Sequence, residues 1–180
     1  MAPRTHWIFG DQLGPHFLEP RHGGPDAHAP VLMIEARSVL RRRRFHRAKA
    51  HLVLSAMRHR AAELGDRVRY VQARTYTEGL AEAGFDGGGG RLTVCHPTSR
   101  AALDFVTGRD GIDVLPARGF LLAREEFGAW AEEHGSDRLR MEGFYGWMRR
   151  EQELLMDGDA PAGGTWNLDH DNREPPPRGR

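Results

Sequence analysis

Five short apolar runs, spread over the first two thirds of the chain, constrain its fold more than any other feature. Apolar residues are dense in these runs rather than alternating with polar ones, as in strands that are covered on both faces. Such strands form mostly parallel sheets with helices on either side. We therefore predict strands at residues 6–10, 29–36, 67–73, 91–96 and 112–117.

Segments of helical period separate these runs. After the second run, apolar residues fall at helical spacing at Phe45, Ala48, Leu52, Ala56 and Leu64. Thr98 or Ser99 can cap a second helix, whose expected inward residues are Ala102, Leu103 and Val106. A further helix is predicted at residues 123–134. The alternation predicts an α/β fold with a Rossmann-like, doubly wound, parallel five-stranded sheet, in which ligands bind at the carboxyl ends of the strands.

Composition narrows the class of protein. The 180 residues carry 26 Lys and Arg against 25 Asp and Glu, so the net charge of +1 gives no overall attraction to nucleic acid. The single cysteine, Cys95, excludes an internal disulfide and a self-contained iron–sulfur cluster. The sequence shows neither a signal peptide nor an apolar segment long enough to span a bilayer. We expect a cytoplasmic protein without membrane partners.

The segment FGDQL, residues 9–13, follows the first predicted strand. Gly10 could let a ligand approach the backbone, and Asp11 and Gln12 offer hydrogen bonds, although a polar turn capped by Asp11 explains the same residues. Glu35 ends the second strand, where it could contact a ribityl or ribose hydroxyl or simply be solvated. Glycine-rich phosphate-binding fingerprints are absent from the sequence, which argues against a dinucleotide enzyme or a nucleoside triphosphatase.

The other candidate groups favour no catalytic chemistry. Residues 41–44 are four arginines at the start of a predicted helix, and they form either a solvated face or a contact with phosphates. The spacing of His46, His51 and His59 misses the geometry of a helical metal site. Cys95 is expected to fill a small apolar position in a buried strand. We predict neither a catalytic residue nor a metal ligand.

The character of the chain changes after Gly135. Residues 140–156 predict a helix with one aromatic-rich face, formed by Met141, Phe144, Tyr145, Met148 and Leu155. Proline and glycine then predict an extended linker up to the end of the chain. We therefore divide the chain into an α/β domain at residues 1–135 and a junction helix with a linker at residues 136–180.

Three segments together resemble a known family. They are FGDQL (9–13), KAHLVLSAMRHRAAEL (49–64) followed by VRYVQ, and MEGFYGWMRREQELLMDGDAPAGGTWNLDHDNR (141–173). The sequence is similar to the N-terminal part of the bacterial photolyase-related proteins, the photolyase and cryptochrome branch whose catalytic domain carries an iron–sulfur cluster. The resemblance implies an antenna-binding α/β domain that leads into a helical domain holding FAD and a 4Fe-4S cluster, which would be supplied in cis or in trans.

The resemblance also implies roles for individual residues. The antenna pocket, which in relatives holds a ribityl-lumazine, corresponds to Phe9, Gly10, Asp11, Gln12, Leu13, Glu35, Ala36, His46 and Lys49. The junction with the helical domain corresponds to Phe144, Tyr145, Trp147, Trp166, Asn167, Asp169, Asn172 and Arg173. In this sequence RSVLRRRR replaces a less basic stretch of the family. Damaged DNA would be bound only through the helical domain.

Three functions remain open from the sequence. The first is a photolyase-family domain that binds a light-harvesting chromophore for light-driven DNA repair and has no catalytic activity alone. The second is a stand-alone binder of a nucleotide-like or lumazine-like molecule, which would leave an exposed aromatic surface at Phe144, Trp147 and Trp166 open to self-association. The third is an adaptor that binds DNA through residues 41–44.

Overall fold

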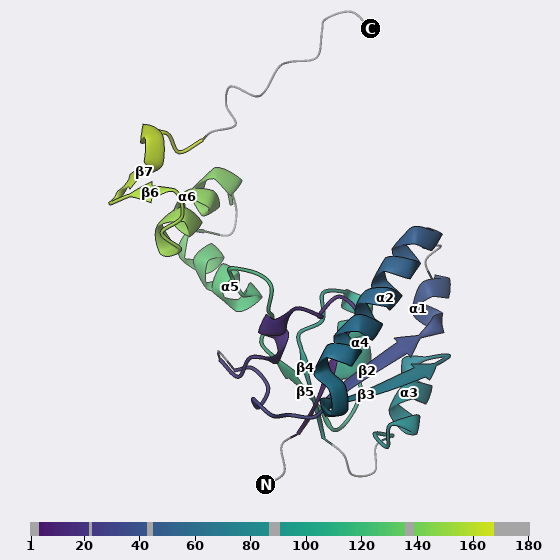
Figure 1. Ribbon diagram of the computed structural model, residues 1–180. Coiled ribbons are helices and arrows are strands. Elements are labelled where there is room, and N and C mark those ends of the chain that lie inside the picture. The colour runs from purple at the N-terminus through teal and green to yellow at the C-terminus, as the bar shows by residue number, and fades with distance from the viewer. Residues whose placement is uncertain (1–3, 22, 43–44, 87–90, 136–138, 168–180) are drawn as a thin grey trace, which may run out of the picture. The chain divides into compact units, whose positions relative to one another are not determined.

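The computed structural model describes residues 4–21, 23–42, 45–86, 91–135 and 139–167. The chain forms two compact units, Met1–Phe120 and Leu121–Arg180 (Figure 1). This division by compactness assigns the helix at residues 124–133 to the second unit. The functional boundary at residue 135 stays a prediction.

The first unit is built on a five-stranded parallel sheet. Its strands are β1 (Thr5–Ile8), β2 (Val31–Ala36), β3 (Val68–Ala73), β4 (Leu92–Cys95) and β5 (Ile112–Leu115). Their order in the sheet is β3-β2-β1-β4-β5, and each neighbouring pair is parallel. All five predicted strands are confirmed. β1 ends at Ile8, earlier than predicted, because Phe9 leaves the ladder and its carbonyl accepts a turn hydrogen bond from the Gln12 amide at 2.9 Å.

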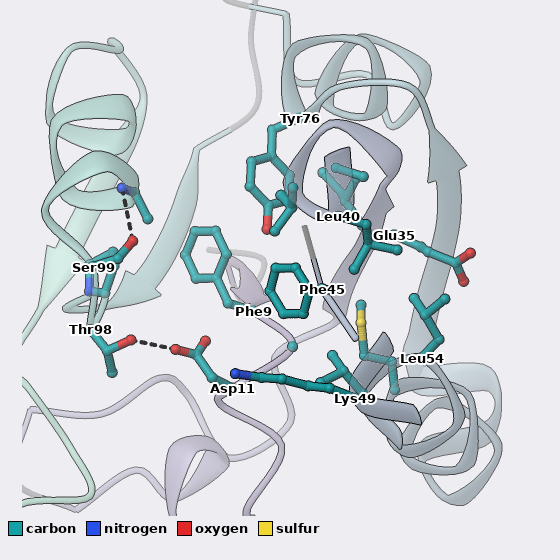
Figure 2. Close-up of a pocket in the computed structure, with 18 residues that line it drawn as sticks. Phe9, Asp11, Glu35, Leu40, Phe45, Lys49, Leu54, Tyr76, Thr98 and Ser99 are labelled. Atoms are coloured by element: carbon teal, nitrogen blue, oxygen red, sulfur yellow. Dashed lines mark hydrogen bonds between the residues drawn. The ribbon is translucent and has the colours of Figure 1, made fainter. Parts of the chain in front are cut away.

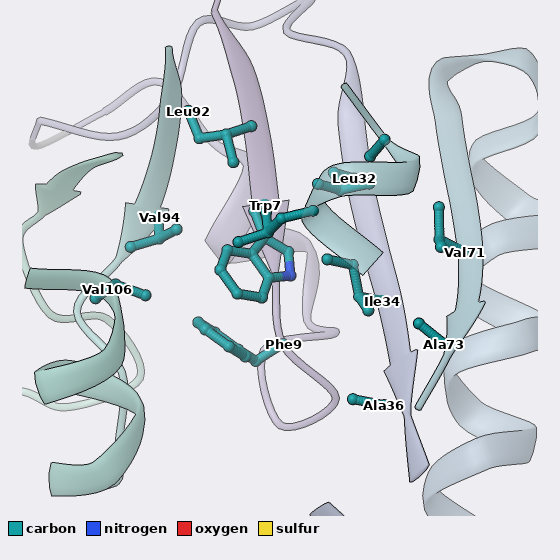
Figure 3. Close-up of a cluster of buried hydrophobic side chains, with 12 residues drawn as sticks. Trp7, Phe9, Leu32, Ile34, Ala36, Val71, Ala73, Leu92, Val94 and Val106 are labelled. Carbon is teal, nitrogen blue, oxygen red and sulfur yellow. The ribbon is translucent and has the colours of Figure 1, made fainter. Parts of the chain in front are cut away.

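Helices cover both faces of this sheet. They are α1 (Arg37–Arg42), α2 (Arg47–Leu64), α3 (Tyr76–Glu82) and α4 (Arg100–Thr107), with short 3-10 turns at η1 (Pro15–Leu18) and η2 (Gly65–Arg67). One core cluster, with Trp7 at its centre, includes Leu80 of α3 and Val106 of α4 (Figure 3). The opposite cluster joins Ile8 and Met33 to Met57 of α2. The doubly wound, Rossmann-like fold is therefore confirmed.

The orientation of α2 differs from the predicted spacing. Leu52, which belongs to that series, is 68% exposed. The buried face instead contains Met57, with Val53, Leu54, Ala61 and Leu64 packed around it. Both series are compatible with a helical period and Leu64 belongs to both, so periodicity alone does not decide between them. Contact with β1 and β2 selects the second series.

The start of α4 follows the sequence prediction. Ser99 is the N-cap, and its hydroxyl oxygen accepts a hydrogen bond from the Ala102 amide at 3.2 Å. Such a cap satisfies one of the amide groups that a helix leaves unpaired at its start. Ala102, Leu103 and Val106 then pack against the core cluster around Trp7, as predicted.

The second unit contains two helices and a small hairpin. Its elements are α5 (Arg124–Glu133), α6 (Met141–Glu151), β6 (Met156–Asp157), β7 (Ala160–Pro161) and η4 (Ala162–Gly164). The helix predicted to reach residue 156 is wrong at its end, because Glu153 and Leu155 adopt left-handed φ values of 51° and 54°. Leu155 therefore lies outside the helical face assigned to it. β6 and β7 form an antiparallel pair that begins at the last residue of the predicted helix and continues into the segment predicted as linker.

Aromatic side chains pack within the second unit. Phe144 of α6 lies with its ring centroid 4.9 Å from Trp130 of α5 and 5.1 Å from Phe127, and Trp147 lies 5.8 Å from Phe144. Arg150 lies over Trp166 at 4.3 Å. Phe144, Trp147 and Trp166 are consequently half-buried, so the expected exposed aromatic surface at these residues is wrong. The exposed apolar side chains of this unit include Met141, Tyr145, Leu154 and Leu155.

Candidate ligand-binding site

A pocket lies at the carboxyl ends of β1, β2 and β4. β1 has β2 on one side and β4 on the other, so the chain reverses its direction of winding between β1 and β4, and α/β proteins bind ligands at such a switch point. The pocket has a volume of about 310 Å³, near the lower end of the usual range for small-molecule sites (Figure 2). It is lined by Phe9, Gly10, Asp11, Ile34, Glu35, Ala36, Val39, Leu40, Phe45, Lys49, Val53, Leu54, Met57, Tyr76, Pro97, Thr98, Ser99 and Ala102.

Apolar and aromatic groups form most of the wall. Phe9 and Tyr76 meet edge to face, with ring centroids 5.5 Å apart. Behind them, the buried Trp7 lies 4.5 Å from Phe9 and 5.2 Å from Tyr76. Aromatic pairs in this arrangement add to the stabilisation from burial, so the wall is held from behind by the core. Such a surface suits the face of a planar ring.

Gly10 brings the loop after β1 against α2. A Cβ atom at this position would lie 3.0 Å from Met57 Sδ and 3.3 Å from Val53 Cγ1. These distances are shorter than ordinary contacts, so a side chain here would push against two residues that line the pocket. The structure thus gives Gly10 a packing role, and a role in ligand approach stays a prediction.

A few polar groups interrupt the apolar wall of the pocket. The Thr98 hydroxyl donates a hydrogen bond to the Asp11 carboxylate, which joins the loop after β1 to the residues after β4 (Figure 2). Burial raises the pKa of Tyr76 to about 12, and the charge of Asp11 adds to this effect. Tyr76 is therefore protonated at neutral pH and can donate a hydrogen bond to a ligand. Lys49 lies over the Phe45 ring, with Nζ 5.2 Å from its centroid.

Glu35 lines the pocket, but other residues hold its carboxylate. The carboxylate accepts hydrogen bonds from the Tyr70 hydroxyl at 2.7 Å, from Arg58 at 3.0 Å and from the Gln72 amide at 3.3 Å. Burial alone raises the pKa of Glu35, but these hydrogen bonds and the charge of Arg58 outweigh it and bring the pKa below its ordinary value. Figure 2 shows the carboxylate directed away from Phe9 and Phe45. Contact between this carboxylate and a ligand stays a prediction.

Gln12, Leu13 and His46, all assigned to the pocket from the sequence, do not line it. The buried Gln12 amide donates to the carbonyl oxygens of Cys95 at 3.2 Å and His96 at 3.3 Å, so it joins the loop after β1 to the end of β4. Leu13 packs in the core cluster that contains α2. His46 caps α2, where its Nδ1 accepts from the Ala48 amide at 3.2 Å. Gln12 therefore positions the pocket loop from behind.

Comparison with known proteins identifies the family of the chain. The sequence model of the deoxyribodipyrimidine photo-lyase-related protein family matches residues 6–180. The chain belongs to this family. It is similar to a (6-4) photolyase of Agrobacterium fabrum (strain C58 / ATCC 33970), with 36% identity over 182 residues that cover 93% of this chain and 35% of that protein. The chain thus spans about a third of the length of this relative.

Sequence reasoning missed several wall residues of this photo-lyase-related chain. They are Ile34, Val39, Leu40, Phe45, Val53, Leu54, Met57, Tyr76, Pro97, Thr98, Ser99 and Ala102. The sequence analysis assigned Thr98 and Ser99 only as helix caps. It did not consider Tyr76, which lies three residues after the end of β3. The signal that could have found these three is the rule already applied to β1 and β2, because the carboxyl ends of all parallel strands meet at one edge. Within the described part of the chain, no three His, Cys, Asp or Glu residues come together as a metal site, and no helix could span a membrane.

Arg149 of α6 has a structural role that the sequence analysis did not predict. It is only 2% exposed, and its guanidinium donates to four main-chain carbonyls, those of Leu154, Leu155, Thr165 and Trp166. The distance is 3.1 Å to the Trp166 carbonyl and 3.3 Å to that of Leu154. A planar fork with five N–H donors is suited to this task. Arg149 therefore holds the hairpin and the GGTW segment against α6.

The predicted junction residues have different environments. Phe144 and Trp147 belong to the aromatic cluster, whereas Tyr145 is 43% exposed. Trp166 lies beneath Arg149 and Arg150. Asn167 is the last described residue, and Asp169, Asn172 and Arg173 lie outside the described residues. Their role at a domain junction stays a prediction.

Proposed function

We propose that the first unit binds a light-harvesting chromophore of the ribityl-lumazine type for a protein that repairs DNA with light. The observation that carries this proposal is the aromatic-walled pocket at the switch point, in a chain of the photo-lyase-related family. A pocket of this kind suits a planar ring with a polyol chain, because its walls are mostly apolar and a few polar groups lie among them. The second unit would lead to the domain that performs the repair.

In this proposal the ring lies between Phe9 and Tyr76 on one side and Met57 and Val53 on the other. The Tyr76 hydroxyl donates a hydrogen bond to a ring carbonyl or nitrogen. Asp11 and Lys49 contact the polyol or the outer edge of the ring. The protein performs no bond chemistry here, since its task is to hold the chromophore at a fixed orientation to a second cofactor.

The repair chemistry would belong to a helical domain that binds FAD and a 4Fe-4S cluster, in cis or in trans. The relative is about three times as long as the matched segment and is named a (6-4) photolyase, which supports a larger photolyase as the complete protein. The single cysteine of this chain cannot supply the thiolates of a cluster. The exposed Met141, Tyr145 and Leu155 of the second unit are candidates for the surface that this domain covers. We place the complete protein in the cytoplasm, where it reaches damaged DNA through that domain.

The test is a fluorescence titration of the purified chain with a ribityl-lumazine. We expect saturable binding of one molecule per chain. The Tyr76→Phe variant should bind roughly three- to tenfold more weakly, since it loses one neutral hydrogen bond. Tyr145→Phe is the matched control because Tyr145 lies outside the pocket in the second unit, and it should bind as the unchanged protein does. A folded protein that does not bind the lumazine would contradict the proposal.

A further inference from the structure

A second hollow continues from the first. It has a volume of about 520 Å³ and lies between α1, the start of α3 and α4. Its lining shares Val39, Phe45, Tyr76, Ser99 and Ala102 with the first pocket. The remaining lining residues are Ser38, Arg42, Thr75, Thr77, Ala101 and Phe105. A ligand whose ring occupies the first pocket could therefore extend into the second past shared walls.

The second hollow has the chemistry of an anion site. Arg42 is the charged residue among its lining residues, and the lining includes no carboxylate. Five hydroxyl groups accompany it, those of Ser38, Thr75, Tyr76, Thr77 and Ser99. By contrast, the first pocket is lined by two acidic residues, Asp11 and Glu35, together with Lys49. The two hollows therefore favour different parts of one ligand.

Arg42 is available for a ligand. Nearby arginines are engaged, since Arg74 pairs with Glu78 and Arg109 lies over the Phe105 ring at 3.5 Å. Arg42 has no such partner within the described residues.

Two of the hydroxyls are oriented by their own helices. Thr75 Oγ1 accepts from the Glu78 amide at 3.1 Å, and Ser99 Oγ accepts from the Ala102 amide at 3.2 Å. Their O–H groups are then left to donate elsewhere, because a hydroxyl can accept and donate at the same time. The hollow thus presents a guanidinium and hydroxyl donors together.

We propose that the second hollow binds a phosphate monoester at the end of the ligand's polyol. The protein would then bind the phosphorylated chromophore more tightly than the free alcohol. The inference rests on the proposed function, because it places the ring in the first pocket. A guanidinium binds a phosphate through two parallel charge-assisted hydrogen bonds, which are stronger than neutral ones. The proposal also assigns a ligand to Arg42, which belongs to the arginine run at residues 41–44.

The test compares two probes, a ribityl-lumazine and the same molecule phosphorylated on its terminal hydroxyl. We expect the phosphorylated probe to bind roughly tenfold more tightly, as one charge-assisted contact provides. The preference should shrink as salt is added, because Arg42 is exposed and its charge is screened. Equal affinities for the two probes would overturn the inference and leave the proposed function intact. Binding of neither probe would overturn both.

Two variants separate a local contact from general charge. Arg42→Gln should abolish the preference for the phosphorylated probe over the free alcohol. Arg41→Gln is the matched control, since it removes the same charge from the neighbouring position of α1 but from a residue outside both pockets. The control should keep the preference. An equal loss in both variants would show long-range attraction alone and would overturn the phosphate site.

Discussion

His6 should make the fold sensitive to mild acid. It is fully buried in β1, with Nδ1 2.9 Å from the Thr93 hydroxyl and Nε2 3.8 Å from Cys95 Sγ. Burial lowers the pKa of His6 from 6.5 to about 4, and the charge of Arg118 adds to the effect. The folded protein therefore keeps this histidine neutral at a pH where an exposed histidine is already charged.

The size of the effect follows from the two pKa values. Above pH 6.5 His6 is neutral in both the folded and the unfolded chain and has no effect on the pH dependence of stability. As the pH falls below 6.5, the unfolded chain takes up a proton that the folded protein does not bind until about pH 4. Since one pKa unit is worth about 1.4 kcal/mol, the free energy of unfolding should fall by about 3 kcal/mol across this window.

The assay is urea unfolding of the unchanged protein and of His6→Gln, at neutral pH and at about pH 4. Glutamine keeps a hydrogen-bonding group near Thr93 but does not titrate. The acid-induced loss of stability should therefore be smaller in the variant by about 3 kcal/mol. Carboxylates titrate in both proteins and cancel in the difference. The same pH dependence in both proteins would refute the assignment of the effect to buried His6.

Three other perturbations test particular contacts. Gly79→Ala should lower the free energy of unfolding by about 1–2 kcal/mol, because the new methyl would lie 2.4 Å from Ile34 Cγ2. Alanine favours helices over glycine, so a gain in stability on urea unfolding would contradict this clash. Tyr70→Phe removes the 2.7 Å hydrogen bond to Glu35 and should raise the pKa of Glu35, which a carboxyl NMR titration measures. On acidification, the stability that this carboxylate contributes should then be lost at a higher pH than in the unchanged protein. Arg149→Lys cannot satisfy the four carbonyls and should cost about 2–4 kcal/mol in the second unit, seen as faster amide exchange at the hairpin.

Much of the fold could be predicted because its signals are local. The density of apolar residues in each run predicted all five strands, and the Ser99 cap predicted the start of α4. The end of α6 was missed because the sequence continues with apolar residues at helical spacing. α6 ends at Glu151, left-handed φ values follow at Glu153 and Leu155, and the Arg149 guanidinium holds the carbonyls of Leu154 and Leu155. Helix propensity does not predict these contacts, because they form only once the Arg149 side chain is buried.

The candidate site was predicted in position but only partly in composition. Phe9, Gly10 and Asp11 follow β1, so the rule on strand ends placed them correctly at the pocket edge. The same rule placed Glu35 there, but not the direction of its carboxylate. Arg58 lies 23 residues further along the chain, and only folding brings its guanidinium within 3.0 Å of this carboxylate.

The sequence by itself determined the class of fold, the family and the edge of the sheet where a ligand would bind. These properties depend on patterns that repeat along the chain or on neighbouring residues. Only the tertiary structure decided which face of α2 is buried, that Arg149 is buried and that a hollow with Arg42 continues from the aromatic pocket. Each of these depends on which groups from distant segments compete for the same space and hydrogen bonds, and that competition exists only once the chain has folded.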